Sequence, residues 1–139
     1  SKKKYCFIVV DMAFHQHCIT VSYMAKLSPY QRHLKQTTMI VYNITAKVTW
    51  AIAEDWLAWQ KQEHIPQMLE TALIADYKIF RLLELDEEEG PTFTMQFFFV
   101  SWENYDMYIR IFSPALRERS LSRWHDQYIA FRTVMELVN

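Results

Sequence analysis

Glycine is nearly absent from this sequence of 139 residues, in which Gly90 is the single example. Dinucleotide-binding fingerprints and phosphate-binding loops need several glycines, because a bare backbone lets amide groups approach phosphate oxygens closely. The sequence therefore excludes both kinds of nucleotide site. Long apolar runs are also missing, and none reaches the roughly 20 residues that a helix needs to span a bilayer. We therefore expect no membrane partner.

Cysteine is scarce, and both cysteines lie near the start of the chain, at Cys6 and Cys18. Thiol nucleophiles, disulfides and thiolate metal sites are therefore excluded after residue 39, and this usage suits a reducing, cytoplasmic location. Cys6 and Cys18 flank His15 and His17, but the spacing lacks the paired short loops of structural zinc sites. We predict no metal and no cofactor.

Charge changes sign along the chain. Residues 1–38 hold six Lys or Arg and one Asp, whereas residues 39–139 hold nine basic and fifteen acidic residues, giving −1 overall. The change at Met39, where a strand pattern begins, predicts a domain at 39–139 and an N-terminal extension at 1–38 outside it. One interpretation of the extension is that the reading frame was begun too early. The alternative is a genuine extra strand with a short helix.

The acidic domain argues against a nucleic-acid partner, since such proteins usually carry a strong basic patch. The second helix does carry a row of basic residues, which we interpret as a solvated, ion-paired helix face. These residues are Arg110, Arg117, Arg119 and Arg123.

Hydrophobic patterning predicts a strand and a helix in the first half of the domain. Alternation from Met39 to Val48 is typical of a strand, and helical spacing follows with Thr49 as the expected N-cap. Pro66 predicts a break or kink near His64, because proline removes a backbone hydrogen bond. A second strand is expected at 77–85.

The second half repeats this order. A charged loop containing Gly90 leads to a strand at 92–101, whose two apolar faces predict a central place in the sheet. Ser101 is the expected cap of a second helix that Pro114 interrupts, and a last strand is expected at 128–138. The fold class is therefore α+β: a ferredoxin-like split βαβ (βαββαβ) with a four-stranded antiparallel sheet and two broken helices on one face.

Five short motifs, taken together and in order, resemble a known family. They are Met39-Ile-Val-Tyr-Asn-Ile-Thr, Glu54-Asp-Trp-Leu-Ala-Trp, His64-Ile-Pro, Glu89-Gly-Pro-Thr and Phe131-Arg-Thr. The family is domain of unknown function 4286, found mainly in Bacteroidetes, and the resemblance covers 39–139 only. It implies a ferredoxin-like domain similar to dimeric α+β barrel proteins. It implies no activity and no catalytic residue.

The first helix offers one group of candidate ligand-binding residues, namely Trp56, Trp59 and His64. Indole faces can clamp a flat ligand, while the imidazole supplies a proton or a metal bond. The alternative is that the tryptophans form a stripe of the core and that His64 caps the helix break.

A second group is expected on the sheet face away from the helices, where polar side chains could orient an acidic ligand, pair across a dimer or face water. Its members are Asn43, Thr45, Gln96, Arg132 and Arg81. The same face is expected to carry an apolar patch that predicts a homodimer, made of Val41, Phe98, Val100 and Val134.

The sequence thus predicts a small cytoplasmic domain that is non-catalytic, self-associates and binds a small apolar or aromatic ligand. The alternative is a dimeric α+β barrel enzyme of the oxygenase or isomerase type. It would act on an aromatic compound, with His64 as acid–base or ligand residue.

Overall fold

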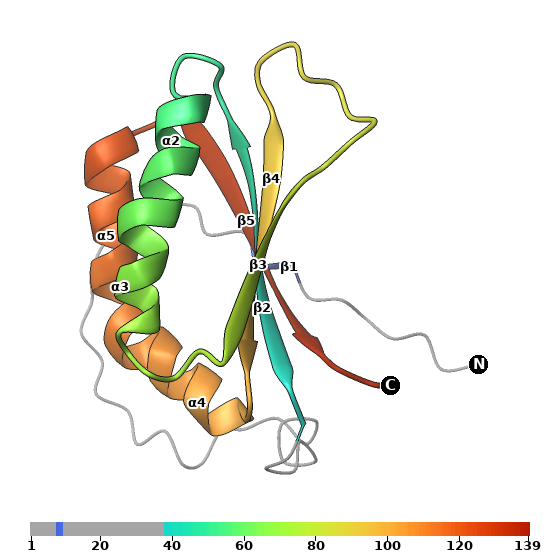
Figure 1. Cartoon of the computed structure of the whole chain (residues 1–139), viewed down its shortest axis with the longest axis vertical. Helices are drawn as coiled ribbons and strands as arrows, with labels where there is room; N and C mark the ends of the chain where they lie inside the picture. The colour runs from blue at the N-terminus through green and yellow to red at the C-terminus, as the bar shows by residue number, and fades with distance from the viewer. Residues whose placement is uncertain (1–7, 10–37) are drawn as a thin grey trace.

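An antiparallel sheet organises the part of the chain that the structure, a computed structural model, describes, namely residues 8–9 and 38–139. The strand order is β1-β5-β2-β4-β3 (Figure 1). The strands are β1 (Ile8–Val9), β2 (Ile40–Val48), β3 (Asp76–Arg81), β4 (Thr92–Phe99) and β5 (Tyr128–Glu136). Four residues that were predicted to bind no metal lie outside the described residues, namely Cys6, His15, His17 and Cys18.

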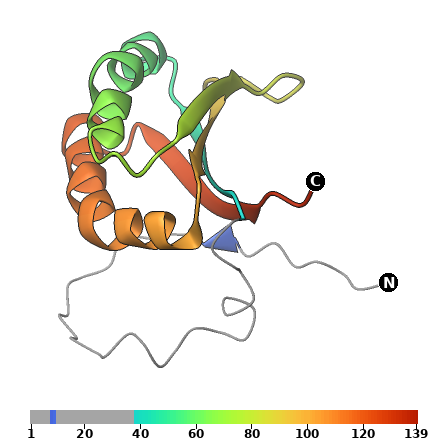
Figure 2. The same cartoon turned by 60° about the horizontal axis from the view of Figure 1, so that its bottom comes forward.

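Two helical arms cover one face of this sheet, as Figures 1 and 2 show. The first arm runs through α2 (Ala53–Trp59), η2 (Gln60–His64) and α3 (Ile65–Leu69). The second arm runs through α4 (Trp102–Met107), η3 (Tyr108–Phe112) and α5 (Ser113–Trp124). The predicted α+β, ferredoxin-like arrangement of strands β2 to β5 with both helices on one face is confirmed. No helix of the described residues is long and apolar enough to cross a bilayer.

The short strand β1 adds a fifth member at one edge of the sheet. Its two residues pair with β5, Ile8 opposite Thr133 and Val9 opposite Arg132. A strand from residues 1–38 was the alternative to an extension outside the domain. Because the pairing covers two residues, the domain boundary at Met39 stays a prediction.

Strand β4 lies between β2 and β3, as its two apolar faces predicted. Every second residue of β4 faces the helices and is buried, namely Phe93, Met95, Phe97 and Phe99. These four side chains join Trp56 of the first arm in the core, where Trp56 stacks on Phe93 with ring centroids 5.7 Å apart.

The helix starts were predicted with mixed success. Ser101 caps the second arm as expected, because its side chain accepts a hydrogen bond of 3.1 Å from the backbone N–H of Asn104. Thr49 does not cap the first arm. A turn intervenes, the N-cap is Ile52, and the backbone N–H of Thr49 instead donates to the carbonyl of Gln127.

Each helical arm contains a π-helical turn directly ahead of a proline. The segments η2 and η3 end two residues before Pro66 and Pro114. A proline has no N–H to donate, so one backbone hydrogen bond of the helix is missing there. In the wider π-helical turn the backbone N–H groups bond to carbonyls five residues back, as Ile65 does to Gln60. The first arm therefore continues through Pro66, where a break or kink was expected.

Strand β3 ends at Arg81, four residues earlier than predicted, and β5 ends at Glu136, two residues earlier. After Leu82, which still donates to the carbonyl of Thr92, the chain leaves the sheet and returns at Gly90. Gly90 has a φ of +151°, and a Cβ there would lie 1.8 Å from the carbonyl oxygen of Val48. Only glycine fits this approach.

The sheet register corrects four residues assigned to the face away from the helices. Arg132 lies opposite Ile44, Val134 opposite Tyr42 and Arg81 opposite Phe93, so all three belong to the helix side. Val100 lies past the end of β4 and is exposed. Sequence alternation alone cannot show which face of a strand is turned to the helices when both faces carry apolar residues. Strand β5 is an example, because its apolar Phe131 lies opposite Thr45, on the face away from the helices.

Candidate functional site

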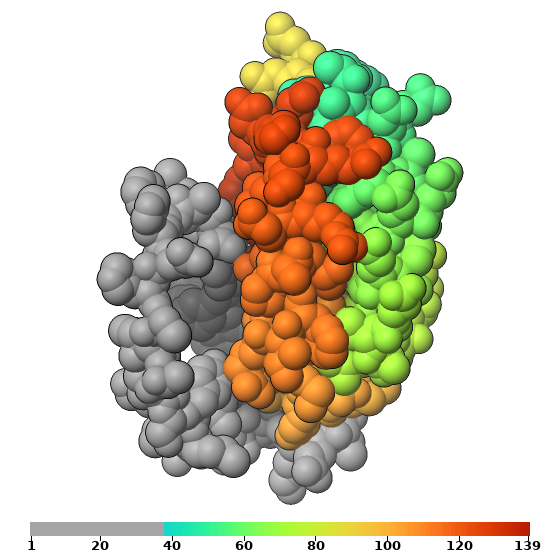
Figure 3. Space-filling model, turned by 90° about the vertical axis from the view of Figure 1, so that its left-hand side faces the viewer, coloured from blue at the N-terminus to red at the C-terminus, as the bar shows by residue number. Residues whose placement is uncertain are grey.

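A cavity lies between the helical arms and the sheet, lined from β2, β4, β5 and both arms. Figure 3 shows the outer surface of this helical layer, where α5 lies against the first arm. The volume of the cavity is about 40 Å³, which is enough for roughly three water molecules. Its polar lining residues are Tyr42, Gln60, His64, Tyr108, Ser113, Arg117, Ser120, Tyr128 and Arg132.

Arginine and tyrosine side chains dominate this polar lining. The Arg117 guanidinium donates to the hydroxyl of Tyr42 over 3.1 Å, while Ser120 and Tyr128 share a hydrogen bond of 2.9 Å. Burial raises the pKa of Tyr108 and the neighbouring Tyr42 raises it further, whereas Arg117 and Arg132 act in the opposite direction. The Tyr108 phenol therefore keeps its proton and remains a hydrogen-bond donor.

His64 lines the cavity from the π-helical turn of the first arm. Its ring stacks on Trp59, with centroids 4.6 Å apart. Burial, followed by the charge of Arg119, lowers the pKa of His64 to about 4. The imidazole is therefore neutral at pH 7, and its buried Nδ1 has no hydrogen-bond partner among the described residues.

The two π-helical turns supply part of the lining. Gln60 and His64 come from η2 and Tyr108 comes from η3. Gln60 is 3% exposed, and its Oε1 has no partner in the described part of the chain. A π turn inserts one extra residue and re-aims the side chains around it, and such turns are frequent at functional sites.

The structure separates the predicted site residues into groups. Trp56, His64 and Arg132 line the cavity. Trp59 lies outside the lining, packed edge-on against Trp124 with centroids 5.9 Å apart. The remaining two candidates, Asn43 and Gln96, lie opposite each other on the other side of the sheet.

Sequence reasoning missed most of the polar lining. Arg117 was assigned to a solvated helix face, but it reaches Tyr42. Tyr42 and Tyr108 occupy positions that hydrophobic patterning alone assigns to the apolar face of a strand and of a helix. A usable signal was present for η2 and η3, because Pro66 and Pro114 each interrupt a well-patterned helix without ending it.

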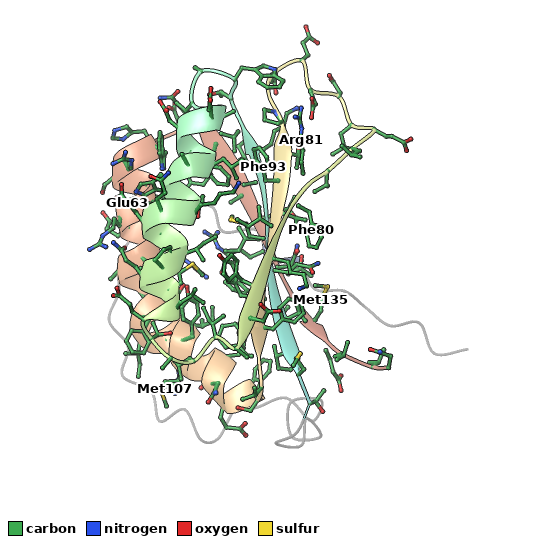
Figure 4. All side chains as sticks on the ribbon, in the orientation of Figure 1. Glu63, Phe80, Arg81, Phe93, Met107 and Met135 are labelled. Carbon is green, nitrogen blue, oxygen red and sulfur yellow. The ribbon has the colours of Figure 1, made fainter. Side chains whose placement is uncertain are left out.

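The face of the sheet away from the helices, here called the open face, has a polar centre with apolar flanks. Asn43, Thr45 and Thr94 bond to one another in a closed ring, with distances of 3.1, 3.4 and 2.6 Å. Phe80 and Phe131 lie at either end of the same cross-strand row. Figure 4 shows Phe80 and Met135 on this side of the sheet and Phe93 on the helix side.

Together these features define a ferredoxin-like α+β domain with a small polar cavity on its helix side. The chain belongs to the family described as Domain of unknown function (DUF4286), whose sequence model matches residues 39–138. No curated protein matches the chain.

Two solved structures are similar to it in fold. One is a dimeric ferredoxin-like protein from an uncultured marine organism, with a TM-score of 0.58 and 10% identity, covering 73% of this chain and 97% of that one. The other is an ethyl tert-butyl ether d (EthD) family protein from Bacillus halodurans, with a TM-score of 0.51 and 13% identity, covering 72% and 98%. At these identities the similarity shows the fold alone.

Proposed function

We propose that this domain is a non-catalytic binding module that self-associates through its open face and holds a small ligand in the cavity on its helix side. We also propose that residues 39–139 form the domain and that it works in a reducing, cytoplasmic setting, because those residues contain no cysteine.

Exposed apolar side chains on the open face carry the proposal of self-association. Phe80 is 45% exposed, Phe131 44% and Ile129 61%. Exposed apolar groups on one sheet face are typical of an interface, and a twofold axis lets two copies cover the same face of each other. The similar marine protein is described as dimeric, which agrees with a second copy of this chain as the partner of the open face.

The polar centre of the open face suits burial against a second copy. The ring formed by Asn43, Thr45 and Thr94 uses its own donors and acceptors. Burying polar groups that already hydrogen-bond to one another is much less unfavourable than burying polar groups that have no partner. The flanking aromatic rings then supply the favourable burial.

Light scattering after size-exclusion chromatography tests self-association, using Phe131→Glu and the control Ile111→Glu. Both variants add one charge at an exposed apolar residue, but Ile111 lies on the helical arm, with 59% exposure. We expect the parent and Ile111→Glu at twice the chain mass of 16.8 kDa and Phe131→Glu shifted towards one copy. A parent that stays at the mass of one copy over the accessible concentration range would overturn the proposal.

The chemistry of His64 supports a binding role over an enzymatic one. General acid–base catalysis is most effective when the pKa lies near the working pH. The pKa of about 4 leaves His64 neutral and weakly basic. One observation favours the enzymatic alternative: His64 lines the cavity, and its buried Nδ1 has no hydrogen-bond partner among the described residues.

Size also separates the two functions. A cavity of about 40 Å³ has room for roughly three to five non-hydrogen atoms, whereas an aromatic compound has at least six ring atoms. An enzyme acting on an aromatic substrate would therefore need side chains such as Trp56 or Met68 to move. A small ligand needs no such movement.

A further inference from the structure

The charges around the cavity are of one sign. Among the described residues, two guanidinium groups line it, from Arg117 on α5 and Arg132 on β5, and no carboxylate does. An anion bound in the cavity would therefore face two guanidinium groups.

Of the two arginines, Arg132 gives the stronger indication that the cavity binds an anion. Its Nε atom is buried and has no hydrogen-bond partner in the described residues. A buried guanidinium donor without a partner is unfavourable, because it has lost its bond to water. A carboxylate accepts from a guanidinium through two oxygens at once, which matches the fork of N–H groups on arginine.

The other walls of the cavity restrict the anion. Ile44, Met95 and Leu116 contribute apolar side chains, so part of the bound molecule would lie against hydrocarbon. A phosphate ion offers oxygen in every direction and would leave some of its oxygens against these apolar walls. A short carboxylate presents two oxygens at one end and a methyl or methylene group at the other.

We propose that the cavity binds a short-chain monocarboxylate of about the size of acetate, with the carboxylate held by Arg132 and Arg117 and the alkyl end against Ile44 and Met95. This inference rests on the proposed function, in which the cavity holds a ligand.

Two neutral neighbours fit this assignment. The hydroxyl of Tyr108 keeps its proton, because burial raises its pKa, and it can donate to an anion. Arg117 lies in the same part of the cavity, because it donates to the hydroxyl of Tyr42, whose ring centroid is 6.3 Å from that of Tyr108. His64 adds no positive charge at pH 7, so the charge selection comes from the arginines.

Isothermal titration of the full chain with sodium acetate, acetamide and inorganic phosphate, at ionic strength fixed with NaCl, tests the proposal. Acetamide has the shape of acetate without its charge. We expect a millimolar dissociation constant for acetate, as befits about four non-hydrogen atoms, with acetamide and phosphate at least tenfold weaker.

Variants locate the binding. Arg132→Met removes the charge and keeps an apolar stem, and we expect it to weaken acetate binding at least tenfold. Arg132→Lys keeps the charge without the fork and is expected to retain part of the affinity. The control Lys61→Met removes a positive charge from the exposed side of η2, outside the cavity lining, and is expected to bind as the parent does. Circular dichroism checks that each variant is folded; if Arg132→Met is unfolded, Arg132→Lys and the comparison of acetate with acetamide decide.

The outcomes separate the inference from the proposed function. Equal binding of acetate and acetamide, or acetate binding unchanged in Arg132→Met, would overturn the carboxylate assignment and leave a ligand cavity standing. Tighter binding of phosphate than of acetate would overturn it in favour of an inorganic oxyanion. No heat from any of the three compounds would likewise overturn the carboxylate assignment.

Discussion

His64 gives the stability of this domain a pH dependence that can be worked out from the structure. Its pKa is lowered from 6.5 to about 4 in the folded chain, by burial first and by Arg119 second. The unfolded chain therefore binds more protons than the folded chain between these two values. It follows that the free energy of unfolding is highest above pH 6.5 and falls as the pH drops towards 4.

The size of the effect follows from the shift in pKa. Each unit is worth about 1.4 kcal/mol, so the full loss between pH 6.5 and 4 is about 3 kcal/mol, and about 2 kcal/mol is lost by pH 5. The variant His64→Phe removes the titrating group and keeps a ring to stack on Trp59. Its stability should lack this part of the pH dependence.

Urea unfolding of both proteins at pH 7 and pH 5, followed by tryptophan fluorescence, measures the difference. Carboxylates and other groups contribute equally to parent and variant, so the comparison isolates His64. We expect the parent to lose about 2 kcal/mol more than His64→Phe between the two pH values. Equal losses would show that His64 ionises normally in the folded chain and would return it to consideration as an acid–base residue.

Two further predictions concern the chain outside the cavity. Gly90→Ala would bring a Cβ within 1.8 Å of the Val48 carbonyl oxygen at a φ of +151°, so we expect urea unfolding to show a loss of at least about 2 kcal/mol. A loss below about 0.5 kcal/mol would contradict the loop geometry. A chain beginning at Met39 should melt within about 4 °C of the full chain, since the described pairing of β1 with β5 covers two residues. A larger drop would show that residues 1–38 belong to the folded domain.

Periodic patterns were enough to predict the fold of residues 39–139. Strand alternation, the Ser101 cap and the turn at Gly90 are local signals, and each agrees with the structure. The misplaced elements depend on bonds to distant residues. Thr49 does not cap the first arm, because a turn places the helix start at Ala53, and the backbone N–H of Thr49 bonds to Gln127, 78 residues further along the chain.

The candidate site was harder to predict, because it depends on strand register and on helix geometry. Arg132 faces the cavity because it pairs with Ile44, a register that the alternation of β5 does not fix. Gln60 and Tyr108 reach the lining from π-helical turns, whose extra residue shifts the ordinary helical spacing. The extra residue of each π-helical turn offsets a helical wheel of 3.6 residues per turn for the residues that follow it.

Amide and side-chain NMR of the full chain during a titration with acetate shows whether the cavity on the helix side is a binding site. We expect saturable shifts for the Nε–H of Arg132 and the indole N–H of Trp56, both at the cavity, with Asn43 and Gln96 on the open face unmoved. Shifts confined to exposed residues, or rising without saturation across the chain, would contradict it.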